Sequence, residues 1–107
     1  MSVKIMTLAK YLYVVRMDVD PAVEAEFNVW YNDVHIPALL QVPGVIAAYR
    51  YKSVEGTPKF VAIYEMESPS VRTSDAWKHA VEITPRPLGV TPLNLTRNVY
   101  EQIFPTV

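Results

Sequence analysis

The chain has 107 residues, half of them hydrophobic, and its ten Lys and Arg against eleven Asp and Glu give a formal net charge of -1. This length predicts a single domain over residues 1–107, and the balanced charge, without a basic stripe, argues against a nucleic-acid partner. The absence of cysteine excludes disulfides and thiolate chemistry, and because no apolar run could span a membrane and no signal peptide is recognisable, a cytoplasmic protein is expected.

The first two predicted elements are a strand and a long amphipathic helix. Residues 10–19, "KYLYVVRMDV", alternate along the chain and are mostly β-branched or aromatic, as in a strand. Asp20 is a suitable N-cap for the helix that follows, and Pro21 suits its first position. The apolar residues that then recur at helical spacing are Phe27, Trp30, Tyr31, Val34 and Ala38.

The rest of the chain is predicted to form a hairpin, a second helix and a last strand. "VIAAYRYKSV" and "KFVAIYEME" alternate like strands on either side of a turn at "EGTP". "SPSVRTSDAWKHAVEI" is typical of a helix capped near Ser70 or Ser74, whose inward-facing residues would be Ala76, Trp77, Ala80 and Val81. "TPRPLGVTP" holds three prolines and a glycine and is expected to be a loop, and "NLTRNVYEQIF" is a fourth strand.

This order of elements predicts an α+β, ferredoxin-like fold, a β-α-β-β-α-β chain with a four-stranded antiparallel sheet and two helices on one face. The other face would then be expected to carry polar residues. Instead, both sets of alternating positions are mostly apolar or aromatic in all four strands. We therefore expect the back of the sheet to be covered by the same face of a second copy, in a two-fold homodimer.

Four segments carry a resemblance to a known superfamily: "WYNDVHIPALLQVPGV", "AAYRY", "SDAWKHA" and "RNVYEQIFP". In them the chain resembles the dimeric α+β barrel superfamily, and within it the small proteins related to the EthD group. The resemblance implies a homodimer with a small apolar pocket between sheet and helices in each protomer, and a histidine, here His35, beside the pocket mouth. It leaves the chemistry open, because members range from cofactor-free oxygenation of quinol-like aromatics through polyketide ring closure, lactone isomerisation and dehalogenation to haem handling.

His35 is the first candidate catalytic residue, with Tyr31 as its local partner. Tyr31 lies four residues earlier, so the two side chains are expected on the same side of the helix, whereas Asp33 points elsewhere. Pro37 would clash with the carbonyl oxygen of Asp33, so the helix should end or kink around His35. The dipole at a helix C-terminus favours the imidazolium and burial disfavours it, so His35 is expected to titrate near neutral pH, as a general acid or base does. The alternative is a His35 that only caps the last carbonyls and packs on aromatics.

An aromatic lining of the pocket is expected from the tyrosines and Trp30. Such a lining would hold a small apolar, aromatic or polyketide-like ligand, although aromatics at strand spacing can equally be core. The candidate substrate-binding residues are Trp30, Tyr13, Tyr49, Tyr51, Tyr64 and Arg50. Arg50 would either hold a carboxylate or enolate oxygen or form a salt bridge with Glu65 in the hairpin.

No cofactor or metal is expected. The two histidines lie in different elements, no carboxylate-histidine cluster has ligand spacing, and no phosphate loop, nucleotide or flavin motif is present. The sequence therefore favours a cofactor-independent enzyme of the cyclase, isomerase or lyase type, which abstracts a proton next to a carbonyl in an aromatic, polyketide-like or lactone substrate. The alternatives are a non-catalytic dimer that binds a hydrophobic metabolite and a cofactor-free oxygenase of quinol-like aromatics.

Overall fold

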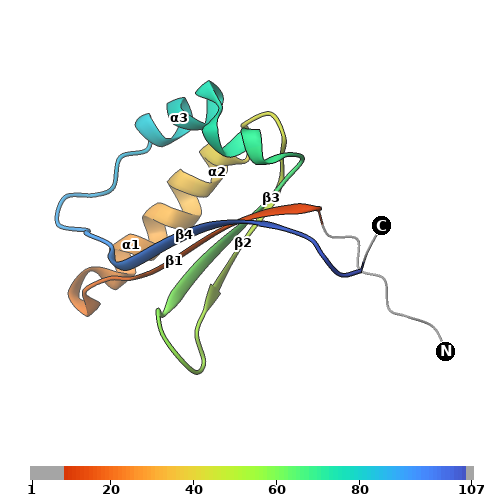
Figure 1. Cartoon of the computed structure of the whole chain (residues 1–107). Helices are drawn as coiled ribbons and strands as arrows, with labels where there is room; N and C mark the ends of the chain where they lie inside the picture. Colours follow the sequence, from red (N-terminus) through yellow and green to blue (C-terminus); the bar gives the residue numbers. More distant parts are fainter. Residues whose placement is uncertain (1–8, 106–107) are drawn as a thin grey trace.

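The structure, a computed structural model that describes residues 9–105, is a four-stranded sheet with helices on one face (Figure 1). The strands are β1 (Tyr11–Asp18), β2 (Val45–Lys52), β3 (Phe60–Met66) and β4 (Leu93–Glu101), all antiparallel, in the order β2-β3-β1-β4. Each of the two central strands leads into a helical region, so the predicted ferredoxin-like α+β fold is confirmed. No helix in this part of the chain has the length and apolar character needed to span a membrane.

The first helical region is one continuous helical segment between β1 and β2. It begins with the 3₁₀ turn η1 (Pro21–Val23), where the side chain of Asp20 accepts a hydrogen bond from the Ala22 N–H at 2.8 Å, as expected of the predicted N-cap. α1 (Glu24–Trp30), the π-helical turn η2 (Tyr31–His35) and α2 (Ile36–Leu39) follow without a break.

Of the two predicted outcomes around His35, an end or a kink, the structure excludes the end, because the helix continues through a π-helical turn. The Ile36 N–H bonds to the carbonyl oxygen of Tyr31, five residues earlier. In a regular α-helix Pro37 could not donate to the Asp33 carbonyl and its ring would press against that oxygen. A wider turn just before the proline relieves this contact, so the helix continues and the expected break becomes a bulge.

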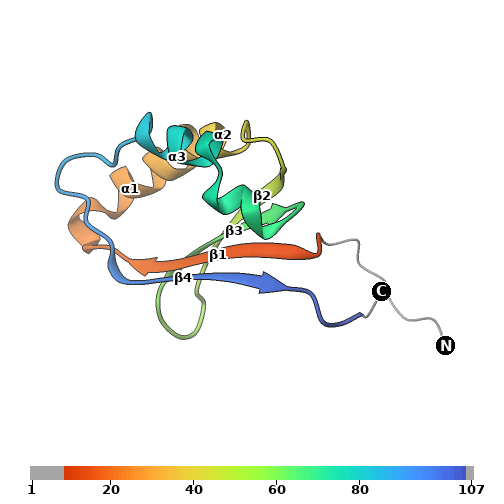
Figure 2. The same ribbon diagram turned by 45° about the horizontal axis from the view of Figure 1, so that its top comes forward.

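The second helical region lies beside the first, over the same face of the sheet (Figure 2). The short turn η3 (Pro69–Thr73) leads into α3 (Asp75–Glu82). Ser74 Oγ accepts a hydrogen bond from the Trp77 N–H at 3.2 Å, so Ser74 and not Ser70 is the cap. Trp77 and Ala80 are buried as predicted, but Ala76 and Val81 are exposed because only a narrow side of this short helix faces the sheet.

The two faces of the sheet differ in what covers them. The core under the helices contains Tyr13, Met17, Phe27, Phe60 and Tyr64. On the opposite face Val14 is buried among its neighbours, whereas Tyr49 and Tyr51 remain 44% and 59% exposed. The predicted apolar back face is present in β1, β2 and β3, but β4 contributes Thr96 and Asn98 to it. The homodimer expected from this face remains a prediction.

Strand register overturns the predicted salt bridge between Arg50 and Glu65. Arg50 pairs with Ala62 on the helix-facing side, whereas Glu65 pairs with Ala47 on the opposite side. Side chains an odd number of residues apart along a strand point to opposite faces, so the two charges are separated by the sheet itself.

Candidate functional site

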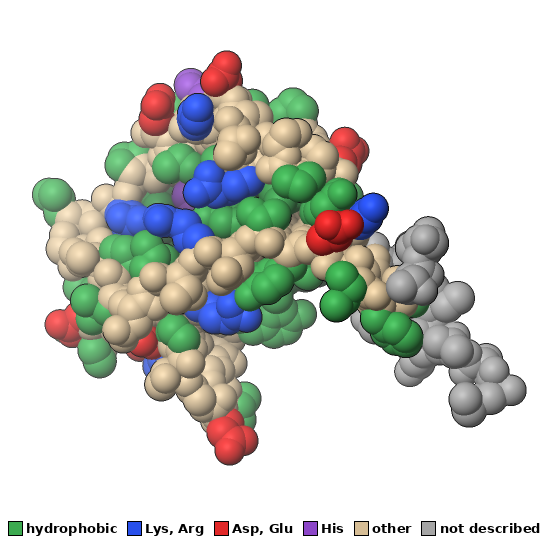
Figure 3. All heavy atoms as spheres, in the orientation of Figure 1, with side chains coloured by type: hydrophobic (Ala, Val, Ile, Leu, Met, Phe, Trp, Pro, Cys, Tyr) green, Lys and Arg blue, Asp and Glu red, His purple; other side chains and the backbone are tan. Residues whose placement is uncertain are grey.

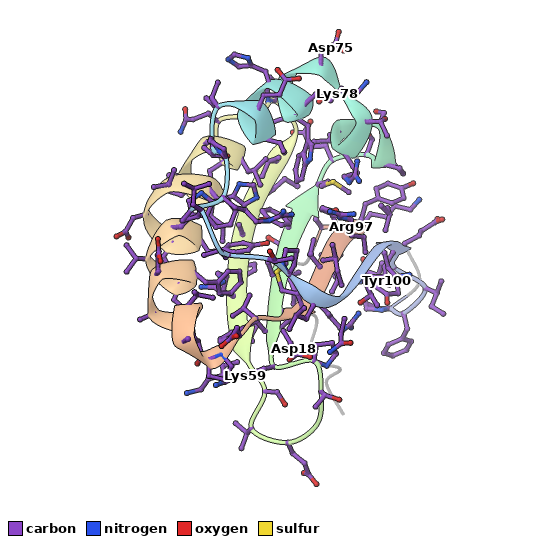
Figure 4. The ribbon with its side chains drawn as sticks, turned by 90° about the vertical axis from the view of Figure 1, so that its left-hand side faces the viewer. Asp18, Lys59, Asp75, Lys78, Arg97 and Tyr100 are labelled. Carbon is purple, nitrogen blue, oxygen red and sulfur yellow. The ribbon has the colours of Figure 1, made fainter. Side chains whose placement is uncertain are left out.

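A cavity of about 450 Å³ lies between the helix-facing side of the sheet and the helices. Its floor comes from β1, β3 and β4, and its walls from α1, η2, α3 and the loop after α3. Side chains from the helices and the sheet converge on this space (Figure 4). The residues that line it include Tyr13, Trp30, Tyr31, His35, Tyr64, Arg72, Trp77, Lys78, Thr84, Arg86 and Arg97. A cavity of this size fits a small organic ligand.

His35 is held in one tautomer by Thr84. The Thr84 hydroxyl donates its single proton to the carbonyl oxygen of Ala80 at 2.8 Å, a bond that also caps the end of α3. His35 Nδ1 lies 3.0 Å from the same hydroxyl oxygen. Because that oxygen has no second proton, Nδ1–H is the donor, and the neutral imidazole keeps its lone pair on Nε2.

The π-helical turn brings two aromatic rings of its own helix against His35. The Trp30 ring is stacked on the imidazole at 4.5 Å between centroids, and the Tyr31 ring meets it edge-on at 5.2 Å. In η2 the residues four and five positions apart share one side of the helix, so both rings reach the same imidazole. Tyr31 therefore packs on His35, while the hydrogen bond to His35 comes from Thr84.

Burial keeps His35 neutral. It lowers the pKa of His35 from 6.5 to about 4, and the positive charge of Arg86 lowers the pKa further in the same direction. The expectation that His35 titrates near neutral pH is therefore wrong, because the helix does not end there and its dipole offers no compensation. At neutral pH the group is an unprotonated base.

The phenols beside His35 stay protonated. Burial raises the pKa of Tyr31 and raises that of Tyr64 still more strongly. Tyr64 also packs on Tyr13 and Trp77, with ring centroids 5.8 and 5.3 Å apart. The Tyr64 hydroxyl and the Trp30 indole nitrogen are buried and have no hydrogen-bond partner within residues 9–105. These two polar atoms are thus enclosed among the aromatic side chains of residues that line the cavity.

Arg50 lies behind Tyr31 and does not line this cavity. Its carbon Cζ is 4.4 Å from the centroid of the Tyr31 ring, and its two terminal nitrogens donate to Asn28 Oδ1 and Asn32 Oδ1, each at 2.9 Å. The helix-facing position of Arg50 places it under α1, so its two terminal nitrogens bind side chains of the helix, while its Nε is buried without a partner in the described residues. The expectation that Arg50 holds a ligand is corrected to a structural contact.

Tyr49 and Tyr51 do not line the cavity either. They alternate with Arg50 on β2 and therefore lie on the back of the sheet, opposite Ile63 and Val61. The Tyr49 hydroxyl donates to Glu65 Oε2 at 3.3 Å on that face. Of the predicted substrate-binding residues, the structure brings Tyr13, Trp30 and Tyr64 to the cavity together with His35 and Tyr31.

Sequence reasoning named five of the lining residues as site residues and missed the others. The missed residues with polar or aromatic side chains include Arg72, Trp77, Lys78, Thr84, Arg86 and Arg97. Trp77 had a signal, since its helical spacing marked it as inward-facing, but that spacing cannot separate core from cavity. Thr84 and Arg86 lie in a segment whose three prolines marked only a loop, and nothing local ties that loop to His35, 49 residues away in the chain.

One family matches most of the chain. Residues 10–83 match the family described as "Domain of unknown function (DUF4286)". The chain belongs to this family. A search of the curated proteins found no significant match to this DUF4286 chain.

Solved structures that resemble this DUF4286 chain share its fold at low sequence identity. A haem-degrading protein, MhuD, from Mycobacterium tuberculosis, solved with two haems in its active site, aligns with a TM-score of 0.66 and 16% identity over 91% of this chain and 99% of that chain. A monooxygenase from Streptomyces coelicolor in complex with nanaomycin D aligns with a TM-score of 0.60 and 18% identity over 88% of each chain. An EthD family protein from Bacillus halodurans aligns with a TM-score of 0.57 and 14% identity over 87% of this chain and 99% of that chain. The resemblance to the dimeric α+β barrel superfamily and its EthD group is thereby confirmed as one of fold.

The DUF4286 cavity offers acid-base chemistry from its own side chains. A neutral imidazole and two protonated phenols belong to residues that line this cavity, together with aromatic rings and charged side chains. Within residues 9–105, no group of three or more His, Cys, Asp or Glu side chains could hold a metal ion. The arrangement suits proton transfer to and from a bound organic molecule.

Proposed function

We propose that this protein is a cofactor-independent enzyme that moves a proton on a carbon next to a carbonyl, in a cyclase, isomerase or lyase type of reaction. The observation that carries the proposal is the hydrogen bond at 3.0 Å between His35 Nδ1 and Thr84 Oγ1. This bond leaves Nε2 of His35, a residue that lines the cavity, as an unprotonated acceptor. The sequence has no nucleotide, flavin or phosphate motif that would supply a cofactor instead.

His35 is the catalytic residue of the proposed reaction. Its Nε2 takes a proton from the carbon, and the electron pair of that C–H bond moves into the carbonyl to form an enolate. The imidazolium then returns the proton to another carbon, which is isomerisation. Alternatively, the enolate carbon attacks a second carbonyl carbon of the substrate to close a ring, and the imidazolium protonates the resulting alkoxide. In a lyase reaction the carbon next to the enolate carbon loses a leaving group with its bonding electron pair, and the imidazolium protonates that group. Because the pKa of His35 is about 4, the substrate carbon must be unusually acidic, as between two carbonyls of a polyketide-like compound.

The remaining cavity residues are proposed to bind and polarise the substrate. Tyr31 or Tyr64, kept protonated by burial, would donate a hydrogen bond to the enolate oxygen. The rings of Trp30, Tyr13 and Trp77 would hold a flat aromatic or lactone body.

A cofactor-free oxygenase is the second candidate, and it is favoured by the fold neighbours. One of them is described as a monooxygenase bound to nanaomycin D and another as a haem degrader. In this reading His35 would deprotonate a quinol-like aromatic, which would then pass an electron to oxygen. Oxygen uptake with a dihydroxy-aromatic compound separates this candidate from the first. A non-catalytic binder of a hydrophobic metabolite would show neither uptake nor proton exchange.

We further propose that the protein acts as a homodimer. Tyr49 and Tyr51 leave apolar surface on the back of the sheet, and Ile46 at the same edge strand is 54% exposed. A second copy placed on this face by a two-fold axis would cover it. Native mass spectrometry of the gently purified chain would report both the dimer and any small molecule retained in the cavity.

Deuterium exchange tests the role of His35 without knowledge of the product. A panel of aromatic 1,3-dicarbonyl compounds is incubated with the protein in deuterated water, and exchange at the acidic carbon is followed by proton NMR. We expect the wild-type protein to accelerate exchange for at least one compound that binds, and the His35→Ala variant to lose this acceleration by about 100-fold or more. The matched control is His79→Ala, which removes the other, exposed histidine. Equal exchange in wild type and His35→Ala would contradict the proposal.

A further inference from the structure

The mouth of the cavity is strongly positive in a chain that is close to neutral. Four cationic side chains line the cavity, Arg72, Lys78, Arg86 and Arg97, against the single carboxylate of Glu82. The whole chain has a formal net charge of -1, so this excess of three positive charges is local. Lys and Arg side chains gather around the hollow in the surface, with apolar side chains inside (Figure 3).

These cations have no anionic partner in the described chain. Within residues 9–105 the ion pairs join Lys10 to Glu101 and Lys59 to Glu24, none of which lines the cavity. Lys78 and Glu82 are one helical turn apart on α3, yet they form no ion pair within 4.0 Å. The four cations are therefore not a salt-bridge network that stabilises the fold.

Arg72 packs on an aromatic ring of the cavity, and Arg86 lines the same cavity as His35. The guanidinium carbon of Arg72 lies 4.8 Å from the centroid of the Tyr13 ring, and its Nε is buried without a hydrogen-bond partner in the described residues. Arg86 is close enough to His35 for its charge to act on the imidazole. Arg50, which lies outside this cavity, donates from its two terminal nitrogens to asparagine oxygens, although its Nε is also buried without a partner. None of the four cations that line the cavity has a carboxylate within 4.0 Å in residues 9–105.

The cations also come from four separate elements of the fold. Lys78 is on α3 and Arg97 is on β4 (Figure 4), Arg72 is in η3, and Arg86 lies in the loop after α3. Side chains from the sheet, a helix and a loop thus bring like charges around one opening. Like charges around a partly enclosed space repel one another, and a bound anion removes this repulsion.

We propose that the ligand of this cavity is an aromatic acid, whose anionic group binds Arg86 and Arg97 at the mouth while its ring lies between Tyr13, Trp30 and Trp77. Arginine forms paired hydrogen bonds with a carboxylate or sulfonate, so two arginines fix the orientation as well as the charge of the ligand. The inference deepens the proposed function by naming the charge of its substrate, but it concerns binding alone and does not need His35 to be a base.

Two dyes that differ in one anionic group test the proposal. 8-Anilinonaphthalene-1-sulfonate carries a sulfonate, and N-phenyl-1-naphthylamine has the same aromatic skeleton without it. Both are titrated into the full chain by fluorescence, and their site is checked through the two tryptophan indole N–H signals in a nitrogen-15 NMR spectrum. Both tryptophans of the chain line the cavity, so these signals report binding there.

The expected result is a loss confined to the anionic dye. We expect the Arg86→Gln/Arg97→Gln variant to bind the sulfonate dye about tenfold or more weakly, with the neutral dye changed less than about twofold. The control Lys52→Gln removes one exposed cation that does not line the cavity and should change neither affinity.

Three results would overturn the proposal. They are equal binding of the two dyes, equal weakening of both in the double variant, and binding of the sulfonate dye that moves neither indole signal. A failed deuterium-exchange test would leave a positive dye result standing, because the exchange reports His35 and the dyes report the arginines. The two proposals can therefore fail separately.

Discussion

Tyrosines alternate along the strands on both faces of the sheet, but the two faces differ in how far these side chains are buried. On the helix-facing side, β1 and β3 place Tyr13 and Tyr64 under the helices, where they are 5% and 1% exposed and line the cavity. On the back, β2 places Tyr49 and Tyr51, which are 44% and 59% exposed. Residues of one chemical type at one spacing thus become cavity wall on one side and open surface on the other. The pattern says which residues share a face, and the helices decide which face is the site.

The largest expected effect is the difference in the free energy of unfolding that is lost when one tyrosine on each face is truncated. Tyr64→Ala removes a fully enclosed ring and is expected to lower the free energy of unfolding by about 3–5 kcal/mol. Tyr51→Ala removes an exposed ring and should cost less than about 1 kcal/mol in the isolated protomer. Urea denaturation at pH 7 measures both values.

Two further observations sharpen this first prediction. Tyr64→Phe keeps the ring and removes only an unpartnered hydroxyl, so it should be close to neutral. If Tyr51→Ala proves as costly as Tyr64→Ala, the back face is as deeply covered as the front, which is the result expected only of a stable dimer.

The pH dependence of stability should identify the buried base on the front face. The pKa of His35 is about 4 in the folded protein and 6.5 in the unfolded reference, so the unfolded chain binds more protons between these values. The neutral, buried His35 therefore contributes up to about 3 kcal/mol to the free energy of unfolding. This contribution is complete above pH 6.5 and is lost as the pH falls from 6.5 to 4. The His35→Gln variant should lose this part of the pH dependence, as seen by thermal unfolding across the window.

His79→Gln is the matched control for that experiment. His79 is exposed on α3, so its replacement should leave the slope of stability against pH as in the wild type. An unchanged slope in His35→Gln would instead show that His35 is accessible to protons in the folded state.

The smallest expected effect concerns the hydroxyl that orients His35. Thr84→Val removes both the acceptor for Nδ1–H and the cap on the Ala80 carbonyl, and should cost about 1–2 kcal/mol. Nitrogen-15 NMR should show the imidazole losing its single Nδ1–H tautomer and exchanging between both forms. Thr84→Ser keeps the hydroxyl and should retain the tautomer, and its loss in Thr84→Ser would mean that another group selects it.

Much of the fold could be predicted from local sequence. The N-cap at Asp20, the cap at Ser74 and the proline-rich loop are each set by residues within a few positions of one another, and the structure has all three. The helix break at Pro37 was predicted in the right place but not in the right form. A proline shows that a regular helix cannot continue, and only the surrounding packing selects a π turn over an end.

The sequence by itself determined the order of elements, the helix cap at Asp20, the apolar character of both faces of β1, β2 and β3, and the histidine on the helix. Tertiary structure decided that Thr84 selects the tautomer of His35 and that the charge of Arg86 lowers the pKa of His35. It also decided that Arg50 binds side chains of the helix instead of lining the cavity. Periodicity and capping act over a few residues, whereas these three contacts join segments 18 to 51 residues apart, whose meeting depends on how the helices lie on the sheet.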